Sequence, residues 1–216
     1  FKKTKQIIDK CKPDYIINTC ALNNVDYCES HPNEARKINT IVVENLSKIS
    51  EKINCKLIHL STDSVFDGNK KTPYIETDIP NPNNVYGLTK LNGEKSVLKN
   101  SNNLVIRASV LYGLLPKNIS TPNTSSMKPM NFGLWLLNKL NSKEEVQIIQ
   151  DEISSPIIAD DFAKSIIHLI KGNYSGIFHS APNICINRYD FSKKIAEKLN
   201  LDVKLIKPIS NKKLGR

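Results

Sequence analysis

Two side chains of complementary chemistry lie four residues apart, at Tyr86 and Lys90. Residues at this spacing share one face of a helix, so the phenol and the ammonium can act together. A nearby ammonium stabilises a phenolate and lowers the pKa of the phenol, which suits proton donation to a carbonyl oxygen that is becoming an alkoxide. The spacing alone does not identify a site, because the chain contains it again at Tyr189 and Lys193.

A hydroxyl at the end of a strand distinguishes the first pair from the second. Thr62 follows the apolar run 56–60, which is predicted to be a strand, and Tyr86 begins the next helix, predicted at 84–100. From the carboxyl edge of that strand, the hydroxyl of Thr62 can hydrogen-bond the oxygen that Tyr86 protonates. Tyr189 has no such neighbour in the pattern, and we interpret it as a surface helix residue.

The first half of the chain alternates short apolar runs with amphipathic segments. Strands are predicted at 15–18, 56–60 and 104–107, and a long helix is expected to start at Ser30 as its N-cap and to continue to Ile53. This alternation predicts right-handed parallel crossovers, and therefore an α/β fold with a doubly wound, Rossmann-like parallel sheet. Such sheets bind ligands at the carboxyl ends of their strands.

The second half is predicted to be α/β as well. Residues 114–128 are rich in Pro, Ser, Thr and Asn, so a loop and a domain boundary are expected there. We divide the chain into residues 1–113 and 114–216, and expect some segments of the second part to return to the sheet of the first. Helices are predicted at 132–140, 160–170 and 189–199, and strands at 146–149, 177–179 and 203–206.

Composition argues against several classes of protein. The 216 residues carry a formal net charge of +10, but the lysines are dispersed without interleaved aromatics, so no nucleic-acid partner is expected. Five cysteines without a C-x-x-C pair and four scattered histidines predict no metal site, and we interpret His59 and His179 as packed core residues. With no apolar run of membrane-spanning length and no signal-peptide pattern, no membrane partner is expected and the expected compartment is the cytoplasm.

Several motifs in order resemble those of the extended short-chain dehydrogenase/reductases, and among them the dTDP-4-dehydrorhamnose reductases. An ordered set is far more specific than one tyrosine–lysine pair, and weaker matches continue to the end of the chain. The matching blocks are 13–18 (PDYIIN), 25–26 (VD), Asn39, 61–68 (STDSVFDG), 73–74 (PY), Glu76, Pro82, 84–87 (NVYG), 90–91 (KL), 93–94 (GE), Arg107, Ser109 and 112–113 (YG).

The resemblance implies reduction of the 4-keto group of a nucleotide-linked deoxysugar by NADPH or NADH. In that scheme Tyr86 is the general acid, Lys90 holds the cofactor's ribose hydroxyls and tunes Tyr86, and Thr62 orients the substrate carbonyl. Residues 1–113 become part of a dinucleotide-binding domain, 114–216 mainly a substrate-binding part, and a homodimer is considered. Besides Tyr86 and Lys90, the implied cofactor-binding residues are Asn18, Thr19, Cys20, Ala21, Asn39, Ser61 and Ser109, and the implied substrate-binding residues are Val25, Asp26, Asp63, Ser64, Val110 and Asn131.

The chain also departs from the family pattern. Ser64 stands where an aromatic is usual, Val110 where a tryptophan is common, and 151–157 (DEISSPI) differs from the usual D-Q-x-G-x-P-T, so the sugar is in question. The first glycine is Gly68, so no glycine-rich phosphate loop is present. We therefore hypothesise that the chain is an internal piece of a longer protein. It would lack the first βαβ unit, about 50 residues with its flanking loops, at the front, and some residues at the back.

Two alternatives stay open at this point. The chain also resembles the beta subunit of methionine adenosyltransferase, a non-catalytic regulatory subunit that keeps the tyrosine–lysine pair. Nucleotide-sugar epimerases and dehydratases share the triad of residue types found here at Thr62, Tyr86 and Lys90. Dehydratases generally place an acidic pair directly after the threonine, whereas here Asp63 is followed by Ser64, which disfavours that reading.

Overall fold

The computed structural model describes residues 2–113 and 131–214 of the chain, so the loop predicted at 114–128 lies outside the described residues. The chain divides into two compact units. The first comprises Phe1–Ala108 with Lys164–Ser180, and the second comprises Ser109–Ala163 with Ala181–Arg216. Each unit is therefore built from two separate stretches of the sequence.

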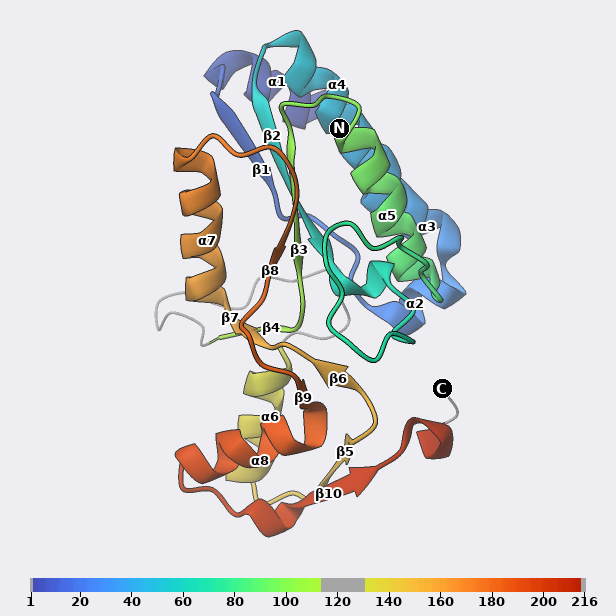
Figure 1. Ribbon diagram of the computed structural model, residues 1–216, viewed down its shortest axis with the longest axis vertical. Helices are drawn as coiled ribbons and strands as arrows, with labels where there is room; N and C mark the ends of the chain where they lie inside the picture. The colour runs from blue at the N-terminus through green and yellow to red at the C-terminus, as the bar shows by residue number, and fades with distance from the viewer. Residues whose placement is uncertain (1, 114–130, 215–216) are drawn as a thin grey trace. The chain divides into compact units, whose positions relative to one another are not determined.

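A four-stranded parallel sheet forms the centre of the first unit (Figure 1). Its strands are β1 (Tyr15–Asn18), β2 (Lys56–Thr62), β3 (Leu104–Ala108) and β8 (Gly176–Ser180), in that spatial order. Helices α4 (Val42–Lys52) and α5 (Val85–Val97) cover one face, and α7 (Ala159–Lys171) lies on the other side (Figure 1). The predicted α/β fold with a parallel, Rossmann-like sheet is confirmed.

The segment between β1 and β2 differs in detail from the expectation. A short helix, α2 (Val25–Ser30), occupies part of the expected loop, and its N-cap Asn24 accepts a hydrogen bond from the Tyr27 amide. Ser30 ends α2 instead of capping the next helix, because its hydroxyl donates to carbonyls of the turn before it. The predicted long helix starts at α3 (Pro32–Arg36) and continues through a π-helical segment (Lys37–Ile41) into α4.

The hydrophobic core of the first unit lies between the sheet and the helices on its α5 side. The strands contribute one row of apolar side chains, which α1 (Lys2–Cys11), α4 and α5 cover with Ile8, Val43 and Val97. The apolar row consists of Ile16, Leu57, Val105 and Ile177. Side chains alternate between the two faces of a strand, so the residue two positions after each of these faces the same helices.

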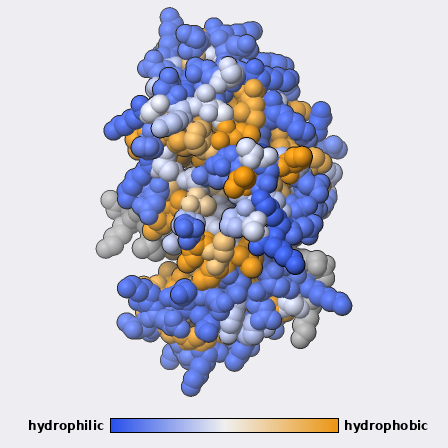
Figure 2. Space-filling model, in the orientation of Figure 1, coloured by the Kyte–Doolittle hydropathy of each residue, from blue (hydrophilic) through white to orange (hydrophobic). Residues whose placement is uncertain are grey.

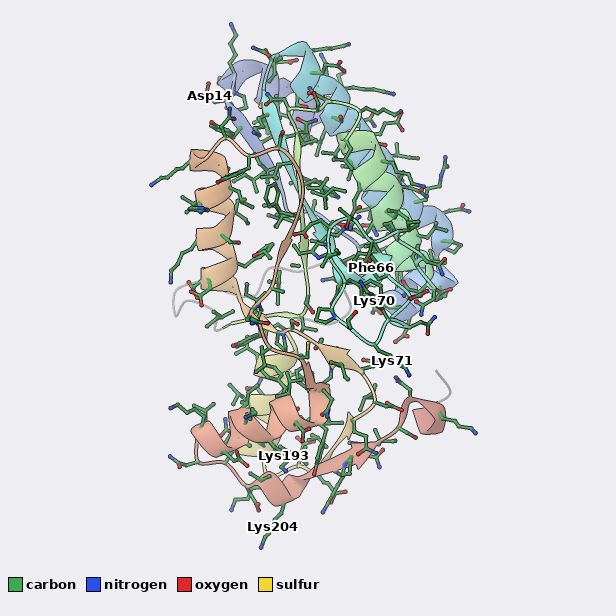
Figure 3. The ribbon with its side chains drawn as sticks, viewed as in Figure 1. Asp14, Phe66, Lys70, Lys71, Lys193 and Lys204 are labelled. Carbon is green, nitrogen blue, oxygen red and sulfur yellow. The ribbon has the colours of Figure 1, made fainter. Side chains whose placement is uncertain are left out.

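A second row of strand side chains lies next to the apolar row, toward the carboxyl end of the sheet, and its residues are polar. It contains a buried ion pair between Arg107 of β3 and Glu94 of α5, whose side chains are 3% and 1% exposed. Two bonds of 2.7 and 3.0 Å join the guanidinium to both carboxylate oxygens, and the Ser61 hydroxyl also donates to Glu94. The ring of Phe66 (Figure 3) lies 5.1 Å from the guanidinium. These contacts attach α5 to β2 and β3.

The second unit is a smaller α/β assembly. Its strand pairs are β4 (Leu111–Tyr112) with β7 (Ile157–Ile158), β5 (Val146–Ile149) with β10 (Ile206–Ile209), and β6 (Ile153–Ser154) with β9 (Ile186–Asn187). Helices α6 (Phe132–Asn141) and α8 (Arg188–Lys198) pack with β5 and β10 around Leu136 and Ala196. The last strand was predicted at 203–206 but begins only at Ile206, because the Asp202 carboxylate caps a 3₁₀ turn at Val203–Leu205.

The surface combines hydrophilic residues with patches of apolar ones (Figure 2). Hydrophilic residues cover most of the face shown in Figure 2. The most exposed large apolar side chains in the described part of the chain include Ile79 at 88% and Ile153 at 74%. No helix among the described residues is long and apolar enough to cross a membrane.

Replacing Glu94 is expected to destabilise the protein strongly. In Glu94→Gln the buried guanidinium of Arg107 loses its counter-charge, so the free energy of unfolding should fall by about 3–5 kcal/mol. Glu44→Gln is the matched control, since Glu44 pairs at 2.7 Å with Lys48 on the exposed side of α4, where the ion pair is screened by water and its loss should change the stability far less. Urea unfolding of the full-length protein measures both values, and equal losses would contradict this assignment.

Candidate active site

Helix α5 begins close to the end of β2, and a glycine permits this approach. Asn84 is the N-cap, and its side-chain oxygen accepts a 2.7 Å hydrogen bond from the Gly87 amide. A Cβ at Gly87 would overlap the backbone carbonyl oxygen of Ser64, in the turn after β2. Only glycine therefore fits without movement of the chain, and the tight contact places Tyr86 beside the end of the strand.

The hydroxyls of Tyr86 and Thr62 meet in this contact. A hydrogen bond from Thr62 lowers the pKa of the Tyr86 phenol, but burial raises it more, and the net effect is a pKa of about 12. Thr62 is itself fixed in the turn, since its oxygen accepts a 3.1 Å hydrogen bond from the Ser64 amide. The Thr62 hydroxyl also lies 3.2 Å from Oδ1 of Asp63 and from Oγ of Ser64. Joint action of Thr62 and Tyr86 on a substrate stays a prediction.

The expected effect of Lys90 on Tyr86 is not present. The sequence interpretation assumed that the ammonium lowers the pKa of the phenol, whereas that pKa is raised by burial. The amine of Lys90 donates instead to the backbone carbonyl of Leu60 at 2.6 Å and lies 3.3 Å from Nε2 of His59. Burial lowers the pKa of Lys90 to about 8, although Glu94 and Cys20 act in the opposite direction.

The loop after β1 lies beside this group. Asn18 and His59 are register partners in adjacent parallel strands, and the Asn18 amide nitrogen lies 3.0 Å from Nδ1 of His59. The Asn18 oxygen accepts a 3.2 Å hydrogen bond from the amide of Cys20, which fixes the start of the loop. Thr19 and Cys20 are exposed and Ala21 is partly buried. Asn18 thus connects the loop to the interior of the sheet.

Asn39 and Ser61 have their polar atoms engaged by the protein itself. The buried Asn39 side chain bonds both backbone groups of Leu22 at 2.8 and 3.0 Å and donates to the Thr89 hydroxyl at 3.1 Å. Ser61 donates to Glu94. These contacts hold the loop and α5 in place, and a role of either residue in cofactor binding stays a prediction.

The residues expected at the substrate, together with Ser109, which is expected at the cofactor, are divided between the two units. In the first unit, Val25 and Asp26 lie exposed at the start of α2, and Asp63 and Ser64 form the turn after Thr62. The other three belong to the second unit, where each has a local partner. Ser109 accepts from the Ser155 amide at 3.2 Å, the Val110 carbonyl accepts from the Ile157 amide at 2.9 Å, and Asn131 caps α6 and donates to the Gly113 carbonyl at 2.8 Å.

The second tyrosine–lysine pair is placed differently. Tyr189 and Lys193 both lie on α8 of the second unit, and the amine is 5.5 Å from the centre of the tyrosine ring. Figure 3 labels Lys193 on this helix. The ring packs against the core of that unit. This pair is a local contact within one helix, which makes it a useful control for Tyr86.

Sequence reasoning overlooked His59. The histidine is fully buried, as expected for a core residue, yet both its ring nitrogens contact polar groups of the site. The alternation of β2 contained the signal, because His59 shares its face with Ser61 and lies two residues after the core residue Leu57. Among the described residues, no cluster of three or more His, Cys, Asp or Glu side chains could hold a metal ion.

The sequence is similar to one protein family and to two kinds of known protein. The family described as RmlD substrate binding domain matches residues 1–216. The dTDP-4-dehydrorhamnose reductase of Shigella flexneri is 32% identical over 198 residues, which cover 89% of this chain and 62% of that protein. The methionine adenosyltransferase 2 subunit beta of Xenopus laevis is 30% identical over 217 residues, which cover 98% of this chain and 62% of that protein.

A solved structure shows the same fold over nearly the whole chain. The dTDP-4-dehydrorhamnose reductase of Bacillus anthracis, in complex with NADP, matches with a TM-score of 0.89 and 28% identity, covering 99% of this chain and 72% of that one. The chain thus spans 62% of the length of the two curated relatives.

Gly87→Ala is expected to destabilise the protein by about 1–3 kcal/mol, because the added methyl group meets the Ser64 carbonyl and the start of α5 must shift. In an open helical position the same change would stabilise the protein by up to about 1 kcal/mol. The sign of the change in stability therefore shows whether the close contact at Gly87 exists. Leu88→Ala is the control, since Leu88 is 48% exposed on the same turn and should cost less than about 1 kcal/mol. Urea unfolding measures both, and a stabilised Gly87→Ala protein would refute the tight contact.

Proposed function

The chain belongs to the RmlD substrate binding domain family, and from that membership we propose that it forms part of an enzyme that reduces the 4-keto group of a nucleotide-linked deoxysugar with NADPH or NADH. The resemblance seen in the sequence is thereby confirmed. The observation that carries the proposed activity is the interaction of the Tyr86 phenol with Thr62 at the carboxyl end of β2. We place the reaction in the cytoplasm on the sequence grounds given above.

The residues at the ends of β1 and β2 fit the nicotinamide and ribose part of such a cofactor. A primary amine carries several N–H donors, which suits Lys90 to a pair of ribose hydroxyls, and the exposed loop at Thr19 and Cys20 borders the same strand ends. Ligands of parallel α/β sheets bind at these ends. When bound, the cofactor supplies the hydride.

Tyr86 is the group that protonates the new hydroxyl. With a pKa of about 12 the phenol is fully protonated at neutral pH, so it can donate a hydrogen bond to the substrate carbonyl oxygen. The Thr62 hydroxyl provides a second donor to that oxygen. As negative charge develops on the oxygen it becomes a stronger base than a phenolate, and the proton passes from Tyr86 to it.

For the sugar nucleotide we propose the contacts that the family resemblance implies, from Val25, Asp26, Asp63, Ser64, Val110 and Asn131, whereas Ser109 would contact the cofactor. In this proposal residues 1–113 hold the dinucleotide and residues 114–216 mainly the substrate. The small Ser64 and Val110, in place of the usual aromatics, would leave room for a sugar different from that of the typical family member.

A second candidate function follows from the similarity to the Xenopus laevis methionine adenosyltransferase 2 subunit beta. Such a protein would regulate a partner instead of turning over a keto sugar. The full-length protein should be incubated with NADPH and a panel of dTDP-linked 4-keto sugars while the absorbance of NADPH is followed. Oxidation with one of the sugars supports the reductase, whereas no oxidation together with co-purification of a synthetase supports the regulatory subunit.

Tyr86→Phe is expected to lower the turnover number by about 10²-fold or more, because the general acid is lost while the ring remains. Tyr189→Phe removes the phenol of the other tyrosine–lysine pair and should leave the rate unchanged. Steady-state rates of NADPH oxidation by the full-length enzyme measure both. Equal rates for Tyr86→Phe and the wild type would exclude Tyr86 as the acid.

A further inference from the structure

His59 connects the loop after β1 to the amine of Lys90 through a chain of hydrogen-bonding atoms. The ring is fully buried, and its two neighbours are nearly so, with Asn18 at 5% and Lys90 at 2% exposure. Nδ1 lies 3.0 Å from the Asn18 amide nitrogen and Nε2 lies 3.3 Å from the Lys90 amine. A Cβ on Gly93 would overlap the backbone carbonyl oxygen of Asn39 at 2.5 Å but would make only an ordinary contact of 3.5 Å with Nε2.

The orientation of Asn18 determines which nitrogen of His59 carries the proton. The backbone amide of Cys20 can only donate, and it donates to the Asn18 side-chain atom that must therefore be the oxygen. The atom facing Nδ1 is then the NH₂ group, which can only donate as well. Nδ1 must accept this bond, so a neutral His59 carries its proton on Nε2, the nitrogen that faces Lys90.

We propose that His59 is a positioning residue which, held by Asn18 as the Nε2-protonated tautomer, donates a hydrogen bond to the amine of Lys90 and favours its uncharged form. An uncharged amine has one lone pair to accept this bond and keeps its N–H groups for the Leu60 carbonyl. An ammonium at the same place would face the Nε2 hydrogen with hydrogens of its own. Every polar atom of the chain from Cys20 to Leu60 is then matched, donor to acceptor.

The charges around the pair are compatible with this arrangement. Burial and the proximity of Lys90 hold the pKa of His59 well below its ordinary value, so the imidazole is neutral. The titratable groups that raise the pKa of Lys90 are Glu94 on its own helix and Cys20 in the loop after β1. Glu94 is already bound to Arg107 and Ser61, and burial outweighs both groups. From β3, the register partner of His59 is the apolar Val105.

The consequence for catalysis rests on the proposed reduction. Once Tyr86 has given its proton to the substrate, the phenolate must regain one, and an ammonium at Lys90 can release it. The balance is one proton lost by Lys90, which becomes a neutral amine, and one gained by Tyr86, which becomes a phenol again. Donation from His59 stabilises the neutral amine, so it makes this release easier near neutral pH.

Nuclear magnetic resonance of the full-length protein tests the arrangement without substrate or cofactor. With ¹⁵N-labelled histidine, His59 should show a protonated Nε2 and an unprotonated Nδ1 between pH 6 and 9, its signals being identified by their loss in His59→Leu. With lysine labelled with ¹³C at Cε, the Lys90 signal should titrate with a midpoint near 8. A proton on Nδ1, or a Lys90 midpoint at the ordinary lysine value, would overturn the proposal even if the enzyme is an active reductase.

The Lys90 titration midpoint in two variants shows whether Nε2 of His59 donates a hydrogen bond to the Lys90 amine or accepts one from it. In His59→Leu the donor to the amine is lost, so the Lys90 midpoint should rise by about one pH unit, a tenfold change in the proton equilibrium. If Nε2 instead accepted a bond from the ammonium, the same variant would lower the midpoint. His59→Gln retains an N–H donor and an oxygen for Asn18, so its midpoint should remain within about half a unit of the wild type. A fall or no change in His59→Leu would refute the proposal.

Discussion

The site depends on how the polar ends of the strands are covered by α5. The row of side chains beyond the apolar core contains Asn18, His59, Arg107 and His179, which are register partners or near neighbours across four parallel strands. Buried polar groups destabilise a fold unless they find partners, and α5 supplies them for two of these residues, with Lys90 beside His59 and Glu94 bound to Arg107. Lys90 and Glu94 are spaced by four residues, so one face of the helix brings an amine and a carboxylate to the row.

Close approach of the helix makes this matching possible. Gly93 leaves space for the backbone carbonyl of Asn39 in the π-helical segment, whereas Gly87 leaves space for that of Ser64. Gly87 directly follows Tyr86, and Gly93 comes three residues after Lys90. The helix is therefore fixed against the turn after β2 near its start and against the π-helical segment further along, and the Arg107–Glu94 ion pair attaches the turn that follows Gly93 to β3.

Much of this arrangement could be predicted from the sequence, and the remainder required three-dimensional contacts. The strands at 15–18, 56–60 and 104–107 and the meeting of Thr62 with Tyr86 follow from short-range patterns and from the rule that parallel strand ends converge. Ser30 was assigned to the wrong helix end, because a turn before it competes for its hydroxyl. His59 was interpreted as simple core, because a strand pattern shows burial but not which nitrogen meets which neighbour.

The most informative difference between the sequence-based expectation and the structure concerns the effect of Lys90 on the pKa of Tyr86. A charge at helical spacing was expected to lower the pKa of the phenol, but both groups are buried, and desolvation disfavours the charged form of each. Their ordinary values, 10.0 and 10.5, are nearly equal, whereas burial moves Tyr86 to about 12 and Lys90 to about 8. The order of the two pKa values is thereby reversed, so there is a pH range in which the phenol is still protonated while the amine is already neutral. In the proposed reduction this order fits Tyr86 as the proton donor and Lys90 as the group that gives up a proton afterwards.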